Sequence, residues 1–270
     1  MCSIIYKLNF IFIIMISDYI KLIKFRYHLS FILVILGALF FAPKINFSLF
    51  ISLLLVYFSF NVLMYTGLYT LNDIADRKSD SLHPLKKYRV ICSGRISLID
   101  AWIFSIFTIF TGLLIAFFAF RNLFYIYLIF IGLNIFYTHF AKKVPYLELV
   151  GNSFTYPLRF VIGILLVSST IPINLVIACF FVAVGGSSER RIIELSHDGY
   201  EARKVLLRYT KNKLSLIQLL SSVIILIFFF IDFPKNWIIY SLFILFYLIF
   251  ILILGYNQKL RPILNKLWLN

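Results

Sequence analysis

Three aspartates at the end of one apolar segment have the spacing of a single helical face. Asp73, Asp76 and Asp80 are three and four residues apart, with Asn72 beside them, so a helix that continues through them places their carboxylates side by side. Neighbouring carboxylates repel one another unless a cation lies between them, and oxygen ligands without a nearby His or Cys favour Mg²⁺. The alternative is an ordinary solvated helix end. A Mg²⁺ site with the three aspartates as the catalytic groups is the other possibility, and the spacing alone leaves both open.

Basic residues follow the aspartates in the same segment. Pro84 and Gly94 break the helix, and Lys86, Arg89 and Arg95 can donate hydrogen bonds to phosphate oxygens. Mg²⁺ in proteins is usually held by one or two carboxylates together with substrate phosphates. Taken alone, these bases are more simply interpreted as positive charges that orient a membrane loop. A site for a metal-bound phosphate is the alternative.

A second charged segment is mainly basic. Residues 189–195 read ERRIIEL and residues 203–210 read RKVLLRYT. A second Mg²⁺ site would need carboxylates, whereas adjacent arginines offer forked donors that suit a phosphate directly. Arg159 is a further isolated cation, because it falls inside an apolar segment, where a charge is costly and usually faces a polar interior with a partner. A purely structural arginine is the alternative there.

The elements that position these residues are membrane-spanning helices. The chain of 270 residues is 62% hydrophobic and 14% charged, with a mean hydropathy of +0.96, which excludes a water-soluble globule. Its apolar blocks have roughly the 20-residue length of a helix that crosses a bilayer. We therefore predict an all-α, polytopic transmembrane bundle of about eight spans. The spans are expected at 29–42, 46–71, 101–120, 123–140, 148–169, 173–188, 214–231 and 236–255.

The predicted organisation has three parts. They are an interfacial N-terminal segment (1–28), the bundle (29–255) with charged loops at 72–100 and 189–213, and a short tail (256–270). These spans place 22 of the 26 Lys and Arg residues on one side, which marks the cytoplasmic face. We expect both termini and both charged loops there, in a prokaryotic plasma membrane. The aromatic residues lie mostly within spans, so nucleic acid is not an expected partner.

The first charged segment resembles the first signature of the UbiA superfamily of intramembrane prenyltransferases. The resemblance lies in the string NDxxDxxxD at 72–80, followed by HPxKxxR and a Ser-Gly-Arg turn. In that superfamily the motif binds Mg²⁺ and a substrate diphosphate at the cytoplasmic mouth of a helical bundle. The superfamily has nine spans, so the eight expected here imply that the last one is missing.

The second charged segment resembles the decaprenyl-phosphate phosphoribosyltransferase branch, whose pattern is close to GKRxxEL followed by RKxLxxYT. Glu189 replaces Gly and Arg190 replaces Lys in this pattern. The Leu-Arg-x-x-x-Gly segment that ends at Gly163 is similar as well. The positions that match are Tyr137, Lys142, Glu148, Arg159, Arg191, Glu194, Leu195, Arg203, Lys204, Leu206, Tyr209 and Thr210.

The resemblance implies transfer of a phosphoribosyl group from phosphoribosyl pyrophosphate to a polyprenyl phosphate, with release of pyrophosphate. Mg²⁺ would neutralise the leaving group, and the lipid phosphate needs mainly positioning. The implied metal ligands are Asn72, Asp73, Asp76 and Asp80. The implied contacts of the sugar phosphate and pyrophosphate are Lys86, Arg89, Arg190, Arg191 and Arg203, and those of the lipid phosphate are Lys21, Lys24 and Arg26. Lys142, Arg159, Glu194 and Tyr209 complete the implied substrate-binding set, with Glu194 orienting Arg191 or a ribose hydroxyl.

Two other functions stay open. A conventional prenyltransferase would use the same Mg²⁺ site to ionise a prenyl diphosphate, and an aromatic or other acceptor would trap the carbocation. A transporter or noncatalytic membrane protein predicts internal repeats and a polar site at the midplane, and the sequence shows no such repeat. The partners expected on the leading interpretation are phosphoribosyl pyrophosphate, the lipid phosphate and the bilayer, and a homo-oligomer is compatible with it.

Overall fold

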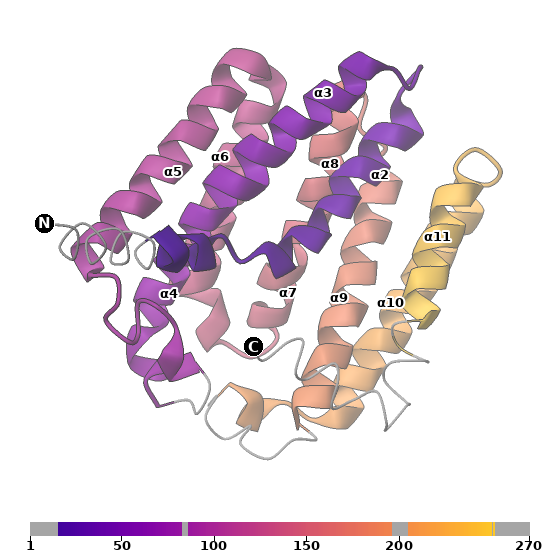
Figure 1. Ribbon diagram of the computed structural model, residues 1–270. Coiled ribbons are helices and arrows are strands. Elements are labelled where there is room, and N and C mark those ends of the chain that lie inside the picture. Colours follow the sequence, from indigo (N-terminus) through magenta and orange to yellow (C-terminus); the bar gives the residue numbers. More distant parts are fainter. Residues whose placement is uncertain (1–15, 83–85, 196–204, 250, 252–270) are drawn as a thin grey trace, which may run out of the picture. The chain divides into compact units, whose positions relative to one another are not determined.

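The computed structural model describes residues 16–82, 86–195, 205–249 and 251 (Figure 1). Every regular element in these ranges is a helix, and none of them contains a strand. The prediction of an all-α protein is confirmed. Seven helices in the described ranges are long and apolar enough to cross a membrane: Ile16–Phe41, Phe47–Asp80, Leu98–Ala119, Arg121–Lys143, Leu147–Val167, Ile173–Leu195 and Lys211–Ile231.

The ends of these helices differ substantially from the predicted spans at three places. The first begins by Ile16 instead of residue 29, and the second continues through the aspartates to Asp80 instead of ending at residue 71. The sixth continues to Leu195 instead of ending at residue 188, so the ERRIIEL string is helical and is not part of a loop. The second difference is the helical continuation that the aspartate spacing requires. The predicted eighth span begins with α11 (Trp237–Leu248), a shorter apolar helix, and its last residues lie outside the described part.

The chain divides into two compact units, each made from two stretches of sequence. Unit 1 contains the residues up to Phe31 and Phe47–Tyr127, and unit 2 contains Ile32–Asn46 and the residues from Leu128 onward. The elements of unit 1 are η1 (Phe25–Phe31), α3 (Phe47–Val56), η2 (Tyr57–Tyr65), α4 (Thr66–Asp80), η3 (Lys86–Tyr88), α5 (Leu98–Ala119) and the first part of α6 (Arg121–His139).

In unit 1, close packing between α4 and α5 holds the helix that carries the aspartates (Figure 1). The Ser105 hydroxyl donates a hydrogen bond of 2.7 Å to the backbone oxygen of Gly67. A Cβ at Gly67 would lie 2.7 Å from the backbone oxygen of Ser105, so only glycine allows this approach. The start of α4 is therefore fixed to α5 by backbone contact, and its last two turns carry the acidic side chains.

Unit 2 is organised around α9 (Ile173–Leu195), which packs against α7, α8, α10 and α11. Its core contains Phe160, Leu175, Ile225 and Tyr240, all less than 6% exposed. The remaining elements of unit 2 are α2 (Ile32–Phe41), the rest of α6, η4 (Ala141–Lys143), α7 (Leu147–Ser153), α8 (Thr155–Val167), η6 (Leu206–Arg208) and α10 (Lys211–Ile231).

The contact between α2 and α8 in unit 2 depends on two glycines that meet the opposite backbone. A Cβ at Gly37 would lie 2.3 Å from the backbone oxygen of Phe160, and one at Gly163 would lie 2.0 Å from that of Val34. Both distances are too short for any other residue without a shift of the helices. The glycine of the Leu-Arg-x-x-x-Gly segment is thus required by helix packing.

Candidate functional site

The first candidate site, in unit 1, gathers two aspartates on one arginine. Asp73 and Asp80 are two turns apart on α4, and Nη1 of Arg89 lies 3.1 Å from Oδ1 of Asp73 and 2.8 Å from Oδ2 of Asp80. The two carboxylate side chains are 3% and 6% exposed. One positively charged nitrogen thus lies between two buried carboxylates, the position in which the sequence predicts a cation.

Lys24 supplies a second positive charge to this group. Its Nζ lies 2.7 Å from Oδ1 and 2.7 Å from Oδ2 of Asp73, and 5.1 Å from the centre of the Tyr69 ring. The backbone of Lys24 has a φ of 50°, a conformation that costs a non-glycine residue free energy and is often retained where function requires it. Asp73, Asp80, Arg89 and Lys24, which we call the aspartate group, have no net formal charge.

Arg89 stays positively charged beside these carboxylates. Burial by itself would lower the pKa of its guanidinium, but the neighbouring carboxylates of Asp73 and Asp80 outweigh that effect and hold the pKa above its ordinary value. Arg89 therefore stays a cation at any physiological pH. It can neutralise carboxylates in the empty protein or donate to an anionic ligand, and its protonation does not change between the two.

A neighbouring set of contacts joins the basic loop to the N-terminal helix. Asp18, which is 4% exposed, accepts hydrogen bonds from Lys21 at 2.7 Å and from Arg95 at 2.8 Å. Arg95 also donates to the backbone oxygen of Tyr88 at 2.9 Å. Gly94 has a φ of 76°, which explains the glycine of the Ser-Gly-Arg turn. Arg95 thus joins the loop to the N-terminal helix, whereas Lys21 pairs with Asp18 within that helix.

Two further cations predicted in unit 1 have described positions. Arg26 donates to the hydroxyl of Tyr27 at 3.2 Å and lies over that ring. Lys86 is the first residue of η3, and its backbone oxygen accepts a 3.0 Å hydrogen bond from the amide of Arg89. The structure brings Arg89 and Lys24 onto the aspartates, whereas Lys21 and Arg26 contact other side chains.

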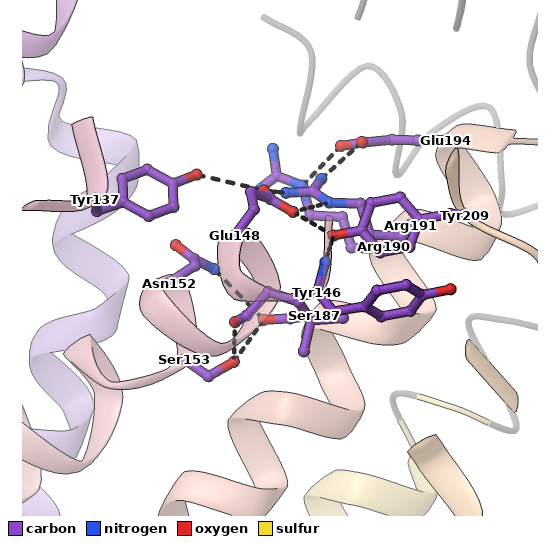
Figure 2. A network of polar contacts seen from close by, with 11 residues as sticks. Tyr137, Tyr146, Glu148, Asn152, Ser153, Ser187, Arg190, Arg191, Glu194 and Tyr209 are labelled. Atoms are coloured by element: carbon purple, nitrogen blue, oxygen red, sulfur yellow. Dashed lines mark hydrogen bonds and ion pairs between the residues drawn. The ribbon is translucent and has the colours of Figure 1, made fainter. Parts of the chain in front are cut away.

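The second candidate site, in unit 2, is a network centred on Glu148 (Figure 2). Glu148 is fully buried and accepts hydrogen bonds from Nε of Arg191 at 3.0 Å, from its Nη2, and from the hydroxyl of Tyr209 at 3.0 Å. Nη1 of Arg191 donates to Glu194 at 2.6 Å, and Nε of Arg190 donates to Glu194 at 3.1 Å. Two arginines and two glutamates thus balance one another in what we call the Glu148 network.

This network changes the interpretation of Arg191. All three nitrogens of its guanidinium are engaged by carboxylates, and its side chain is 4% exposed. A buried arginine that is paired in this way orders the surrounding helices. Binding of phosphate by Arg191 stays a prediction, and its contacts in the structure are internal. The side chain of Arg190 is 33% exposed, so it is more accessible to an anion.

Tyr209 joins the end of the second charged segment to α7. Its hydroxyl donates to Glu148 and accepts a 3.0 Å hydrogen bond from the backbone amide of Tyr146. Tyr146 precedes α7 with a φ of 64°, and Figure 2 shows Tyr146 and Tyr209 beside each other. Burial, and then the charge of Glu148, raise the pKa of Tyr209 above its ordinary value. The tyrosine of the RKxLxxYT string therefore has a structural role in the unliganded protein.

The other residues predicted in unit 2 have different surroundings. Arg159 is 1% exposed, donates from Nη1 to the backbone oxygen of Thr155 at 2.6 Å and lies 4.9 Å from the centre of the Phe130 ring. Lys142 is half-buried in η4. Glu189, which stands at the glycine position of the pattern GKRxxEL, accepts a 2.6 Å hydrogen bond from Gln218. Arg203 lies outside the described residues.

Sequence reasoning assigns no role to Glu148 and a different role to Lys24, although both residues are central to the candidate sites. Glu148 was a matching position without a function, although an acidic residue at the start of an apolar span is itself a signal. Lys24 was expected to meet a lipid phosphate, and the structure places it on Asp73. Both interactions join residues 43 and 49 positions apart, so no local spacing could reveal them.

The aspartate group fits a divalent cation that is completed by a substrate. In the described part of the chain, no three His, Cys, Asp or Glu side chains lie close enough together to hold a metal ion. Two carboxylates do converge on one positive atom, and their ligand atoms are oxygens only. Because Mg²⁺ needs just one or two carboxylates when phosphate oxygens supply further ligands, Asp73 and Asp80 are the residues that would hold it. Asn72 and Asp76 are half-buried on the same helix.

Comparison with known families decides the class of protein. The family described as the UbiA prenyltransferase family matches residues 30–266. The chain belongs to the UbiA prenyltransferase family. With seven helices of membrane-spanning length in the described part, this UbiA protein is an integral, multi-pass membrane protein of a transferase family.

Solved structures share the UbiA fold. A UbiA homologue from Archaeoglobus fulgidus bound to GPP and Mg²⁺ is 19% identical with a TM-score of 0.72, covering 88% of this chain and 87% of that one. The same homologue bound to DMAPP and Mg²⁺ gives 20% identity, a TM-score of 0.73 and the same coverage. A structure from a study of digeranylgeranylglyceryl phosphate synthase gives 20% identity and a TM-score of 0.67, with 94% of each chain covered.

A curated sequence relative is also similar to this UbiA chain. It is named "Uncharacterized protein y4nM", from Sinorhizobium fredii, and is 27% identical over 101 residues, which make up 37% of this chain. The match covers 20% of the relative, so the chain spans about a fifth of the length of that protein. The resemblance to the UbiA superfamily is confirmed. The branch within the superfamily stays a prediction.

Proposed function

We propose that this chain is a Mg²⁺-dependent transferase that moves a phosphoribosyl group from phosphoribosyl pyrophosphate to a polyprenyl phosphate. The observation that carries the proposal is the aspartate group: two buried carboxylates converge on one cationic atom, with a second cation beside them. This set of charges suits a diphosphate that arrives with a divalent metal. Mg²⁺ and prenyl diphosphates are bound by the Archaeoglobus fulgidus homologue of the same fold, which supports use of a metal here.

In this reaction the bond from the ribose anomeric carbon to the pyrophosphate oxygen breaks, and the pyrophosphate leaves with the electron pair. A lipid phosphate oxygen forms the new bond, so the reaction needs no protein nucleophile. Bound Mg²⁺ would supply charge neutralisation of the leaving group. Asp73 and Asp80 would hold the metal, while Arg89, Lys24 and Lys86 would donate hydrogen bonds to pyrophosphate oxygens. These residues orient the leaving group and lower charge repulsion in the transition state.

The choice of a phosphoribosyl donor rests on unit 2. Glu148 and Glu194 are the acidic residues of its network, and both are engaged by arginine. They are therefore poor candidates for a second metal–diphosphate site. Basic residues instead dominate the second charged segment, and Arg190 and Lys142 remain proposed phosphate contacts. A donor with one diphosphate and a separate phosphate, such as phosphoribosyl pyrophosphate, suits this composition better than a prenyl diphosphate does.

One observation favours conventional prenyl transfer as a second candidate. Tyr69 and Tyr65 lie one and two turns before Asp73 on the same helical face, with ring centres 4.4 Å apart and hydroxyls 2.7 Å apart. Aromatic faces stabilise a nearby cation, so these tyrosines are suited to an allylic carbocation formed beside a diphosphate. The Archaeoglobus fulgidus homologue bound to GPP and to DMAPP points in the same direction.

The test is an assay with both donors on the purified full-length protein in lipid vesicles with Mg²⁺. Ribose-labelled phosphoribosyl pyrophosphate with polyprenyl phosphate should give label in an organic-extractable lipid. Asp73→Asn should lower the rate by about 100-fold or more, because metal stabilisation of charge is worth several kcal/mol. Lys78→Gln, an exposed change on the same helix, should leave the rate unchanged. If no ribose label moves while geranyl diphosphate is consumed with an aromatic acceptor, prenyl transfer is the function.

A further inference from the structure

The four charges of the aspartate group balance one another. Asp73 is bonded to both Lys24 and Arg89, and Asp80 is bonded to Arg89, so two carboxylates face two cations. The side chains of Lys24 and Arg89 are 16% and 23% exposed. Water therefore reaches these charges only in part, and their attraction is stronger than that of an exposed ion pair.

A divalent metal alone would meet this neutral group at a disadvantage. It would have to displace one or both cations from the carboxylates, and it would leave two uncompensated positive charges in a partly buried place. A diphosphate ester carries about three negative charges near neutral pH, and a phosphate monoester about two. The metal and a diphosphate together would thus add about one negative charge, a smaller imbalance than the two positive charges that the metal alone would add, and the displaced cations would face diphosphate oxygens.

We infer that Lys24 and Arg89 compete with a metal for the carboxylates of Asp73 and Asp80, and so make the metal bind only together with a diphosphate. This inference rests on the proposed function and adds that binding of the metal depends on the diphosphate. In the loaded site the two cations release carboxylate oxygens and donate to diphosphate oxygens instead. Asp73 and Asp80 then serve the metal, so each charged group exchanges one partner for another.

The positions of the four residues are consistent with movement of the cations instead of the carboxylates. Asp73 and Asp80 belong to the continuous helix α4, which is fixed to α5 at its start. Lys24 lies between the first helix and η1 with a strained φ of 50°. Arg89 follows the single turn of η3 in a loop. Both cations are long, flexible side chains on short connections, so a change of partner does not require a helix to shift.

The number of phosphate oxygens predicts selectivity among anions. A phosphate monoester offers fewer oxygens than a diphosphate for the metal and the two cations together. A diphosphate has enough oxygens to bind the metal and still accept hydrogen bonds from both Lys24 and Arg89. The aspartate group should therefore take up a metal with pyrophosphate and distinguish it from orthophosphate, whatever organic group the diphosphate carries.

The test measures binding of Mn²⁺, as an oxygen-preferring substitute for Mg²⁺, to the purified full-length protein by electron paramagnetic resonance and calorimetry. Titrations are made with no anion, with inorganic pyrophosphate and with inorganic orthophosphate, each corrected for Mn²⁺ bound by the anion in solution. The variants are Lys24→Gln, Arg89→Gln and the charge-conserving Lys24→Arg. Lys78→Gln serves as the control, and a thermal unfolding curve verifies that each variant is folded.

For the unaltered protein, pyrophosphate should tighten Mn²⁺ binding by about 5- to 150-fold, the usual range of coupling between two ligands, and orthophosphate should have a smaller effect. Lys24→Gln and Arg89→Gln should bind Mn²⁺ alone more tightly and show reduced coupling. Lys24→Arg and Lys78→Gln should keep the coupling between Mn²⁺ and pyrophosphate. If the unaltered protein and all variants bind Mn²⁺ equally well with and without pyrophosphate, the inference is wrong and the proposed metal site stands. If none binds Mn²⁺ under any condition, both fail.

Discussion

Replacing Glu148 with glutamine should destabilise the protein more than any surface change. The substitution keeps the size of the side chain but removes the charge that faces Arg191, which is buried with a 4% exposed side chain. Removing one partner of a buried ion pair generally costs about 3 to 5 kcal/mol. The lower end applies here, because Glu194 still accepts from Arg191 and because a helix unfolded within a membrane also finds other partners. We expect a loss of about 3 kcal/mol in the free energy of unfolding.

The assay is unfolding of the purified protein by sodium dodecyl sulfate in mixed micelles, followed by circular dichroism. Tyr137→Phe is the matched control, since its hydroxyl reaches Glu148 at only 3.4 Å and should contribute less than about 1 kcal/mol. The double variant Glu148→Gln with Arg191→Gln removes both charges. It should be more stable than the sum of the two single changes predicts, because no buried charge is left without its partner.

Two results together would contradict this prediction. The free energy of unfolding would fall by less than about 1 kcal/mol in Glu148→Gln, and the loss in the double variant would equal the sum of the losses in the two single variants. Glu148 and Arg191 would then contribute independently, and the Glu148 network would not be a coupled structural unit. Such a result would also make Arg191 available to a ligand, and the phosphate-binding role that the sequence predicts for it would gain support.

Two further predictions concern packing and pH. Gly163→Ala places a Cβ 2.0 Å from the backbone oxygen of Val34, so it should lower the free energy of unfolding by about 1 to 3 kcal/mol. The control is Gly132→Ala, because nothing lies within 4 Å of a Cβ at that position. This change should be neutral or slightly stabilising in the same unfolding assay. Because burial and Glu148 raise the pKa of Tyr209, the folded protein keeps this proton while the unfolded chain loses it above about pH 10. The stability difference between the unaltered protein and Tyr209→Phe should therefore shrink above that pH, and an unchanged difference up to pH 11 would contradict the pKa shift.

Helix α4 is the part of the site that the sequence predicts best. The steps of three and four residues between Asp73, Asp76 and Asp80 repeat the period of a helix, and the structure continues α4 to Asp80. The convergence of Asp73 and Asp80 is a local property, so spacing alone is sufficient to predict it. The cation between them is not local, because Arg89 reaches back over a turn whose geometry no periodic pattern specifies.

The N-terminal helix was not predicted because its charges interrupt the apolar run. Asp18, Lys21 and Lys24 give residues 1–28 the composition of an interfacial segment, yet the described residues from Ile16 onward are helical. Their charges are balanced by partners far along the chain: Arg95 for Asp18, and Asp73 for Lys24. A hydropathy window counts such residues as exposed, since it has no information about partners 77 and 49 positions away.

The Glu148 network shows a similar limit for charged side chains. Arg190 and Arg191 look like phosphate ligands when only their segment is considered, because adjacent arginines suit an anion. The structure places Glu148, which begins another helix, against Arg191. Whether a buried arginine binds a substrate or a carboxylate depends on which acid the fold brings to it, and that information is absent from the spacing of either segment.

The glycine contact between α2 and α8 has a consequence for the time course of biosynthesis. Gly163 follows Gly37 by 126 residues, although both belong to unit 2. At a synthesis rate of about 5 to 20 residues per second, α2 enters the membrane roughly 6 to 25 seconds before its packing partner exists. During that interval the small-residue face of α2 is exposed to lipid or to the insertion machinery, so this helix must remain stable on its own hydropathy until the ribosome has finished α8.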